Sequence, residues 1–256
     1  MRWGMPTLVE FGSAGENVEL CRRLGLDFVE LNMNLPMLQP DDLVRLPVSD
    51  DVFYTIHMDE NFSPADFNPV IADAWMETMR RTLRSSVQIG APLVNMHMSK
   101  GVYFTLPDRK VFLFDRYREE YLQRMLRLRD MCAAELRDSD TCICIENTGG
   151  YLGFQREAVD ILLESDCFGL TWDIGHRHRG SIDDGPFMLE RRNRIRHFHV
   201  HDADACADHL ALGDGEIFIE EMLSLAEACG ARCVLETKTA DALEKSVRWL
   251  RDRRWM

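Results

Sequence analysis

The chain has 256 residues, of which 46% are hydrophobic, and a formal net charge of -13 at pH 7. This length, without a linker rich in Pro, Gly or Ser, favours one α/β domain that spans residues 1–256. The negative charge opposes nonspecific attraction to a polyanion, so nucleic acid is a disfavoured partner.

The distribution of apolar residues argues against a membrane protein. The N-terminal segment Met1–Pro6 has no apolar stretch of signal-peptide length, and nowhere do about 18 uncharged apolar residues run together. Eight cysteines occur without a Cys-x-x-Cys pair, which is typical of reduced thiols rather than of disulfides or a zinc knuckle. We therefore expect a cytoplasmic protein with no membrane partner.

Short β-rich runs alternate with longer amphipathic runs along the chain. The expected strands are Thr7–Phe11, Phe28–Met33, Phe53–Met58, Leu93–Met98, Cys142–Asn147, Phe168–Asp173, Arg196–His201 and Cys233–Thr237. The expected helices are Asn17–Leu24, Asp41–Leu46, Val70–Ile89, Asp115–Arg137, Gln155–Glu164, Pro186–Arg194, Ile217–Cys229 and Ala240–Arg251. Gly25, Gly90 and Gly230 stand between a helix and the next strand, as such turns prefer. The alternation predicts an α/β fold of the (β/α)8 TIM barrel class.

A carboxylate or a histidine stands at or near the end of each of the last four expected strands. These residues are Glu146, Asp173, His199 and Glu236. The carboxyl ends of all barrel strands meet on one face, so residues far apart in the chain converge there. Mixed carboxylate and imidazole donors suit Mn, Zn, Co or Fe. The sequence therefore predicts a site for a divalent metal.

Alternation along the strands adds two histidines to this face. Side chains two positions apart lie on the same side of a strand, which pairs Thr55 with His57 and Asn95 with His97. Direct ligation of a metal and hydrogen bonding to a substrate are equally compatible with this placement of the two histidines.

Seven short strings resemble those of the xylose isomerase-like TIM barrels. They run in register from the third strand to the eighth and are Thr55–His57, Asn95–His97, Ile145–Thr148, Trp172–His176, His199–Asp202, His209–Gly215 and Leu235–Thr237. That superfamily contains sugar and sugar-phosphate isomerases and epimerases, inosose dehydratases and the endonuclease IV repair enzymes. The resemblance implies a metal-dependent enzyme built on a TIM barrel.

The resemblance also implies roles for individual residues. The single-metal isomerases and epimerases of this group hold Mn or a similar ion through residues that match Glu146, Asp173, His199 and Glu236. In the epimerases the two glutamates also act as acid and base. Endonuclease IV binds a second zinc through histidines that match His57 and His97, with Glu146 as the bridge.

A third metal is not expected. In endonuclease IV the third zinc is held by histidines that match His176 and His209 and by an aspartate two positions before the latter. Ala207 occupies that position here, and Asp208 stands at the wrong spacing. We therefore expect one or two metals.

The chemistry of isomerisation gives an independent reason for these residue types. Removing a proton next to a carbonyl needs a base, and a divalent cation stabilises the enediolate that results. Glu146 and Glu236 fit the acid and base roles, and His176 is expected to bind a hydroxyl or relay a proton. Phosphodiester hydrolysis would instead need two or three close cations.

Three further residues are expected to contact substrate. These are His209, Lys100 and Lys238, and the two lysines are candidates for binding a phosphate or a carboxylate. Gly213 and Gly215 follow the seventh strand, where barrels often bind phosphate, although two glycines usually form only a turn.

The remaining ionisable residues near strand ends are expected to have no chemical role. We expect Glu30, in the second strand, to be a salt-bridge or barrel-layer residue. His197 and His201 are expected to be structural, and His178 to lie on the solvated surface.

Three functions are compatible with these features. The favoured one is metal-dependent isomerisation or epimerisation of a small sugar or sugar phosphate. The alternative is a metal-dependent phosphodiesterase resembling endonuclease IV, which His57 and His97 favour and which Ala207 and the acidic charge oppose. A barrel with a purely structural metal is disfavoured, because so many ionisable groups face one cavity. Trp249 and Trp255 could dock on a second subunit, so a homo-oligomer is compatible with the sequence.

Overall fold

The computed structural model describes residues 1–47, 49–180 and 182–256. Eight parallel strands close into a barrel in the order β1-β10-β9-β8-β7-β4-β3-β2. They are β1 (Arg2–Pro6), β2 (Phe28–Asn32), β3 (Phe53–His57), β4 (Leu93–His97), β7 (Cys142–Glu146), β8 (Phe168–Asp173), β9 (Ile195–Val200) and β10 (Arg232–Leu235). The predicted (β/α)8 fold class is confirmed.

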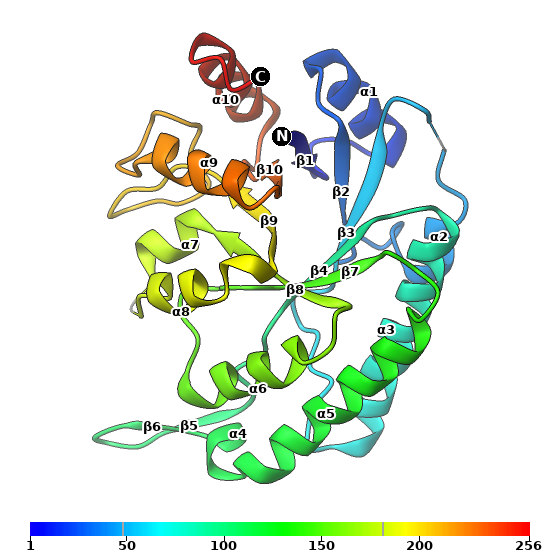
Figure 1. The fold of residues 1–256 in the computed structure, drawn as a ribbon, viewed down its shortest axis with the longest axis vertical. Coiled ribbons are helices and arrows are strands. Elements are labelled where there is room, and N and C mark those ends of the chain that lie inside the picture. Colours follow the sequence, from blue (N-terminus) through cyan, green and yellow to red (C-terminus); the bar gives the residue numbers. More distant parts are fainter. Residues whose placement is uncertain (48, 181) are drawn as a thin grey trace.

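Helices surround the barrel (Figure 1). They are α1 (Ala14–Leu24), α2 (Pro40–Leu43), α3 (Pro69–Gln88), α4 (Leu113–Arg116), α5 (Arg118–Glu135), α6 (Gly153–Leu163), α7 (Ile174–Arg179), α8 (Gly185–Glu190), α9 (Ile219–Ala228) and α10 (Ala240–Asp252), with a 3-10 turn η1 (Arg192–Arg194) before β9. Gly25, Gly90 and Gly230 take φ values of 69°, 68° and 63° in the turns before strands, as expected. Within the described residues, no helix has the length and apolarity needed to cross a bilayer.

Alternating side chains divide each strand between two environments. Apolar residues at every second position join the core shared with the helices, for example Val29, Leu31, Ile56, Val94, Met96, Ile143, Ile145, Leu170, Trp172, Phe198 and Val200. The positions between them face the barrel interior and are polar towards the carboxyl ends. There Thr171 Oγ1 donates a hydrogen bond of 2.6 Å to Asn95 Oδ1, and Asn95 Nδ2 donates one of 2.6 Å to Glu146 Oε2. This polar network lies directly beneath the predicted site.

The first strand lies outside its predicted range. We expected Thr7–Phe11, but β1 is Arg2–Pro6 and residues 7–11 form irregular backbone and turns. Gly4 and Pro6 make this strand hard to recognise in the sequence, because both residue types are depleted in strands. The ring of Phe28 packs so closely against Gly4 that any side chain at position 4 would displace it. A contact from the neighbouring strand therefore explains why glycine occupies this position.

Some elements differ from the predicted pattern. The hairpin of β5 (Tyr103–Thr105) and β6 (Lys110–Phe112) projects from the barrel (Figure 1) and was not expected. The short helix α7 was also not expected. The predicted helix Asp115–Arg137 is divided at Tyr117, whose φ of -115° and ψ of 49° are not helical. The predicted helix Pro186–Arg194 likewise consists of α8 and η1.

Candidate metal centre and active-site cavity

Three carboxylates converge on one nitrogen of His199, a buried residue of β9. The Nδ1 atom of His199 lies 3.2 Å from Glu236 Oε2, 3.3 Å from Glu146 Oε2 and 3.8 Å from Asp173 Oδ2. Glu146 ends β7, Asp173 ends β8, and Glu236 directly follows β10. The structure therefore brings together the four residues that the sequence singled out from four separate strands.

The side of the His199 ring opposite these carboxylates faces Glu30 of β2. His199 Nε2 lies 2.9 Å from Glu30 Oε1, and His197 Nε2 forms a hydrogen bond of 2.9 Å with Glu30 Oε2. Burial would raise the pKa of Glu30, but the charges of His199 and His197 outweigh it and hold that pKa below its ordinary value. A carboxylate facing Nε2 favours the tautomer that leaves the Nδ1 lone pair free for a cation.

Glu30 is thus a buried ion-pair partner, as expected, but it acts on a candidate metal ligand. The sequence did not reveal that the Glu30 carboxylate would contact a candidate metal ligand. The signal available was its place two residues after Phe28, which puts it on the interior face of β2. His197 is confirmed as a structural partner of this carboxylate.

The polar atoms of the site fit a divalent cation. His199 Nδ1 and Glu236 Oε2 are both fully buried, and neither has a hydrogen-bond partner among the described residues. Buried polar atoms without a partner are costly, and a cation between them would satisfy both. Three carboxylates and one imidazole form a donor set suited to Mn, Zn, Co or Fe.

Glu146 connects this group to the histidines of β3 and β4. Its Oε2 atom lies 3.4 Å from His57 Nε2 and 3.2 Å from His97 Nε2, and its Oε1 atom lies 3.2 Å from His176 Nδ1. Burial would raise the pKa of Glu146, but the charges of His97 and His199 hold it well below the ordinary value. His57, Glu146 and His199 form one of the groups whose ligand atoms lie within 4.8 Å of one another.

Asp173 is held by groups from two directions. Its Oδ1 atom accepts a hydrogen bond of 2.6 Å from the backbone N–H of His176, which makes Asp173 the N-cap of α7. His201 Nε2 lies 3.2 Å from the same oxygen. His201 is therefore structural, as expected, and it orients a candidate metal ligand.

A third group of ligand atoms lies at the outer edge of the site. His176, Asp208 and His209 offer three atoms within 4.8 Å of one another. The sequence places Asp208 at the wrong spacing for a third metal, yet its carboxylate lies near both histidines; the expected absence of a third metal stays a prediction. His209 takes a φ of 52°, in the left-handed region, so the backbone here is not an extended strand.

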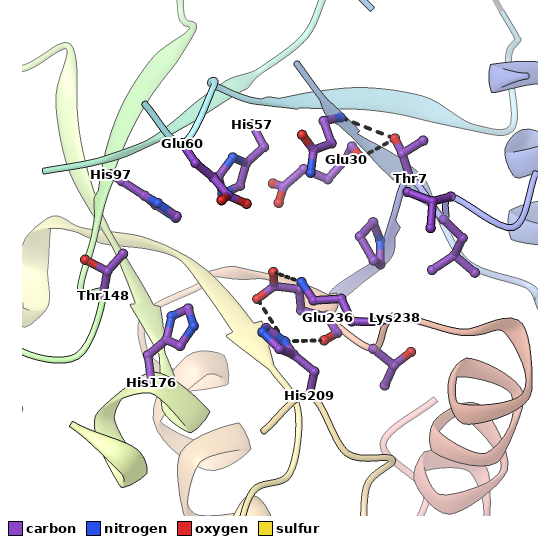
Figure 2. A pocket seen from close by; sticks show the side chains of 15 residues that line it. Thr7, Glu30, His57, Glu60, His97, Thr148, His176, His209, Glu236 and Lys238 are labelled. Atoms are coloured by element: carbon purple, nitrogen blue, oxygen red, sulfur yellow. Dashed lines mark hydrogen bonds and ion pairs between the residues drawn. The ribbon is translucent and has the colours of Figure 1, made fainter. Parts of the chain in front are cut away.

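A cavity of about 430 Å³ opens above these residues. Among the residues that the structure describes, the cavity is lined by Pro6, Thr7, Leu8, Val9, Glu30, Asn32, His57, Glu60, His97, Thr148, His176, His209, Glu236, Thr237 and Lys238. Figure 2 shows the histidines and Glu236 facing the same space. The size falls within the range of small-molecule sites.

The predicted substrate-binding residues fall into two classes. His209 and Lys238 line the cavity, and Lys238 Nζ lies 2.9 Å from Glu236 Oε1. Lys100 is not among the described lining residues, and its contact with substrate stays a prediction. Lys100 belongs to the segment that leads into the projecting hairpin, which sequence reasoning did not foresee. His178 is exposed on α7, as expected.

Comparison with known proteins agrees with this architecture. A family model described as a xylose isomerase-like TIM barrel matches residues 18–253. Comparison with curated proteins gives no match.

Solved structures with the same fold include enzymes named for sugar chemistry. A D-tagatose 3-epimerase-like protein superposes with a TM-score of 0.79 at 22% identity, over 100% of this chain and 97% of that chain. The 3-keto-D-glucoside 4-epimerase YcjR from E. coli gives 0.75 at 16% identity, over 98% and 99%. An IOLI protein with a zinc atom gives 0.72 at 15% identity, over 98% and 97%. At these identities the likeness shows the fold, whereas the family model covers most of the sequence, and this chain belongs to the xylose isomerase-like TIM barrel family.

Proposed function

We propose that this protein is a divalent-metal-dependent isomerase or epimerase of a small sugar or sugar derivative. The observation that carries the proposal is the approach of three carboxylates to the unpaired Nδ1 of His199. The names of the similar structures, which include sugar epimerases, support the same class of substrate. The metal would be held by Glu146, Asp173, His199 and Glu236.

The bound cation would polarise a substrate carbonyl and stabilise the negative charge that develops when the neighbouring carbon loses its proton. The remaining chemistry belongs to the side chains. Glu146 and Glu236 come from different strands and both reach the same point, so each is placed to exchange a proton with substrate bound there.

Glu236 is suited to the role of base. Burial would raise its pKa, but His199 and Lys238 outweigh this and hold the pKa well below the ordinary value. The carboxylate is therefore ionised at neutral pH and able to accept a proton. Lys238 contacts Oε1 of Glu236 and leaves Oε2 directed to the centre of the site.

His176 is suited to holding or moving a proton at the cavity wall. Burial would lower its pKa, but the charges of Asp173 and Glu146 raise that pKa to about 9. An imidazole that carries its proton at neutral pH can donate a hydrogen bond to a substrate oxygen. Its place in the cavity lining makes that contact sterically available.

Two measurements test the proposal together. Protein expressed in metal-replete medium should contain a divalent transition metal by elemental analysis, and the His199→Ala/Glu236→Gln double variant should lose it. Incubation with ketoses and aldoses in heavy water should place deuterium on the carbon next to the carbonyl. A metal-free protein, or a broad sugar panel without exchange, would count against the proposal.

A phosphodiesterase is the second candidate function. His57 and His97 near Glu146, and Asp208 with His176 and His209, offer ligand atoms for additional cations. Metal-dependent cleavage of an abasic-site duplex by the purified protein, without exchange into any sugar, would favour this candidate over the isomerase. The net charge of -13 argues against polyanion binding.

A further inference from the structure

We infer that the cavity selects a neutral polyhydroxylated carbonyl compound and rejects phosphorylated or otherwise anionic sugars. The inference rests on the proposed function and defines its substrate class. It is carried by the charges of the cavity lining and by the way this chain closes the places where barrels bind phosphate.

The charged side chains of the cavity are mostly acidic. Glu30, Glu60 and Glu236 line it, and Glu146 and Asp173 lie beneath. Among the described lining residues Lys238 is the single Lys or Arg side chain, and Glu236 already neutralises it at 2.9 Å. Lys238, a bound divalent cation and a protonated His176 would together supply four positive charges against these five carboxylates. A phosphate ester, which carries close to two negative charges at pH 7, would be repelled.

The histidines of the lining are also engaged. Nitrogen atoms of His57, His97 and His176 lie within 3.4 Å of Glu146. His209 Nδ1 forms a hydrogen bond of 2.9 Å with the backbone oxygen of Glu236. Their positive charge, when present, is therefore already opposed by protein oxygens.

The usual phosphate position after the seventh barrel strand is closed by a carboxylate of this chain. The backbone N–H groups of Ala203, Gly213 and Ile217 donate hydrogen bonds of 2.9, 3.0 and 3.1 Å to the buried carboxylate of Asp202. The turn that carries Gly213 thus points its backbone N–H groups at the buried carboxylate of Asp202. A phosphate there would meet a carboxylate rather than free donors.

At the corresponding position after the eighth strand, an exposed carboxylate of this chain accepts a backbone hydrogen bond. The backbone N–H of Ala240, at the start of α10, donates a hydrogen bond of 2.6 Å to Glu10 Oε2. The Thr239 hydroxyl caps the same helix by accepting from Ala242 N–H at 3.2 Å. In TIM barrels these two loops and a helix N-terminus commonly bind phosphate, and here backbone N–H groups of both loops already donate to carboxylates of this chain.

One arginine lies near the outer group of ligand atoms but is not available for an anion. Arg179 Nη1 lies 3.5 Å from Asp208 Oδ2. Arg179 is not among the described residues of the cavity lining. The positive charge of Arg179 is therefore paired with the carboxylate of Asp208 at the outer edge of the site.

The experiment compares binding as well as turnover. The Mn-loaded protein is titrated with ketopentoses and ketohexoses, with their phosphate esters and with inorganic phosphate, and the same compounds are assayed for deuterium exchange. Free sugars should bind at least about 100-fold more tightly than their esters, and inorganic phosphate should not compete with them. The difference should shrink as ionic strength rises, because salt screens the repulsion.

A charge reversal provides the matched variant. Glu60→Lys, at the cavity wall, should raise the affinity for a sugar phosphate about tenfold or more relative to the free sugar. Asp138→Lys, in the loop before β7 at the opposite end of the barrel, should leave the ratio unchanged. If Glu60→Lys leaves the affinity for the sugar phosphate relative to the free sugar unchanged, charge is not the cause of the selectivity.

The outcomes separate the two proposals. Tighter binding of an ester than of the free sugar, or binding of inorganic phosphate that is lost in Lys238→Met but not in Lys245→Met, overturns the inference. If the ester also exchanges deuterium, the isomerase proposal stands. If no compound exchanges and esters still fail to bind, the isomerase proposal fails while the exclusion of anions by the cavity is supported.

Discussion

Glu30 Oε1 lies 2.9 Å from His199 Nε2, so both ring nitrogens of this buried histidine face carboxylates. Glu30→Gln keeps the volume of the side chain but removes the charge that favours a free Nδ1 lone pair. We expect the variant to bind Mn or Zn about 10–100-fold more weakly, as is typical when the partner of a ligating histidine is lost. Competitive chelator titration measures this.

Glu60→Gln is the matched control for that experiment, because Glu60 lines the same cavity and, among the described residues, is not an ion-pair partner of His199. Circular dichroism verifies that both variants fold. Equal metal affinity in Glu30→Gln and wild type would show that Glu30 does not support the ligand.

Metal binding should stabilise the folded protein through the four converging residues. A cation at 100 times its Kd contributes about 2.7 kcal/mol, since it binds the native state and the unfolded chain lacks the site. We expect a clear rise in Tm when Mn is added to metal-stripped wild type, and almost none in His199→Ala/Glu236→Gln. Differential scanning calorimetry makes the comparison. A similar rise in both proteins would place the metal elsewhere.

Metal affinity should increase with pH. Burial would lower the pKa of His199, but Glu146, Glu30 and Glu236 raise it well above the ordinary value in the metal-free protein. His199 then holds a proton at pH 7 that the cation must displace. Below that pKa, each unit of pH should tighten binding by up to about tenfold. Calorimetric titration at pH 6, 7 and 8, in buffers of different ionisation enthalpy, should also detect the released proton; an affinity independent of pH would contradict the assignment.

His176→Ala should reduce turnover far more than metal content. His176 contacts Glu146 and Asp173 but lies in the cavity wall, where it would reach a bound substrate. Loss of a positioned proton donor costs about 100-fold or more in kcat. His178→Ala is the control, because that histidine is exposed on the same helix. Loss of metal in parallel with activity would instead identify His176 as a ligand.

Gly175→Ala should destabilise the fold and disturb Asp173. A methyl group at position 175 would overlap the ring of His201, which contacts both carboxylate oxygens of Asp173. Overpacking of this kind costs about 1–3 kcal/mol, measurable by urea unfolding. Gly15→Ala in α1 has no such neighbour and should be neutral or slightly stabilising. Equal stability of the two variants would contradict the packing argument.

The residues at the carboxyl ends of the strands were predictable, because period-two alternation and strand order in a parallel barrel fix where they point. Glu146, Asp173, His199 and Glu236 illustrate this. What depended on contacts from distant segments was not predictable. In the sequence Gly4 suggests a break in a strand, and only its contact with the ring of Phe28 in the structure explains why glycine stands there. The proximity of Asp208 to His176 likewise depends on a loop conformation that residue spacing does not reveal.

The carboxylate of Asp202 joins three separate points of the segment between β9 and α9, at Ala203, Gly213 and Ile217. Because Asp202 is buried, we expect these hydrogen bonds to open only when the whole segment separates from the barrel. The Gly213 and Ile217 amides should therefore exchange slowly with heavy water, at rates close to those of the strands. His209 lies within this segment, so we expect the cavity wall that it forms to be ordered in the absence of substrate. Binding should therefore require little loss of backbone entropy there.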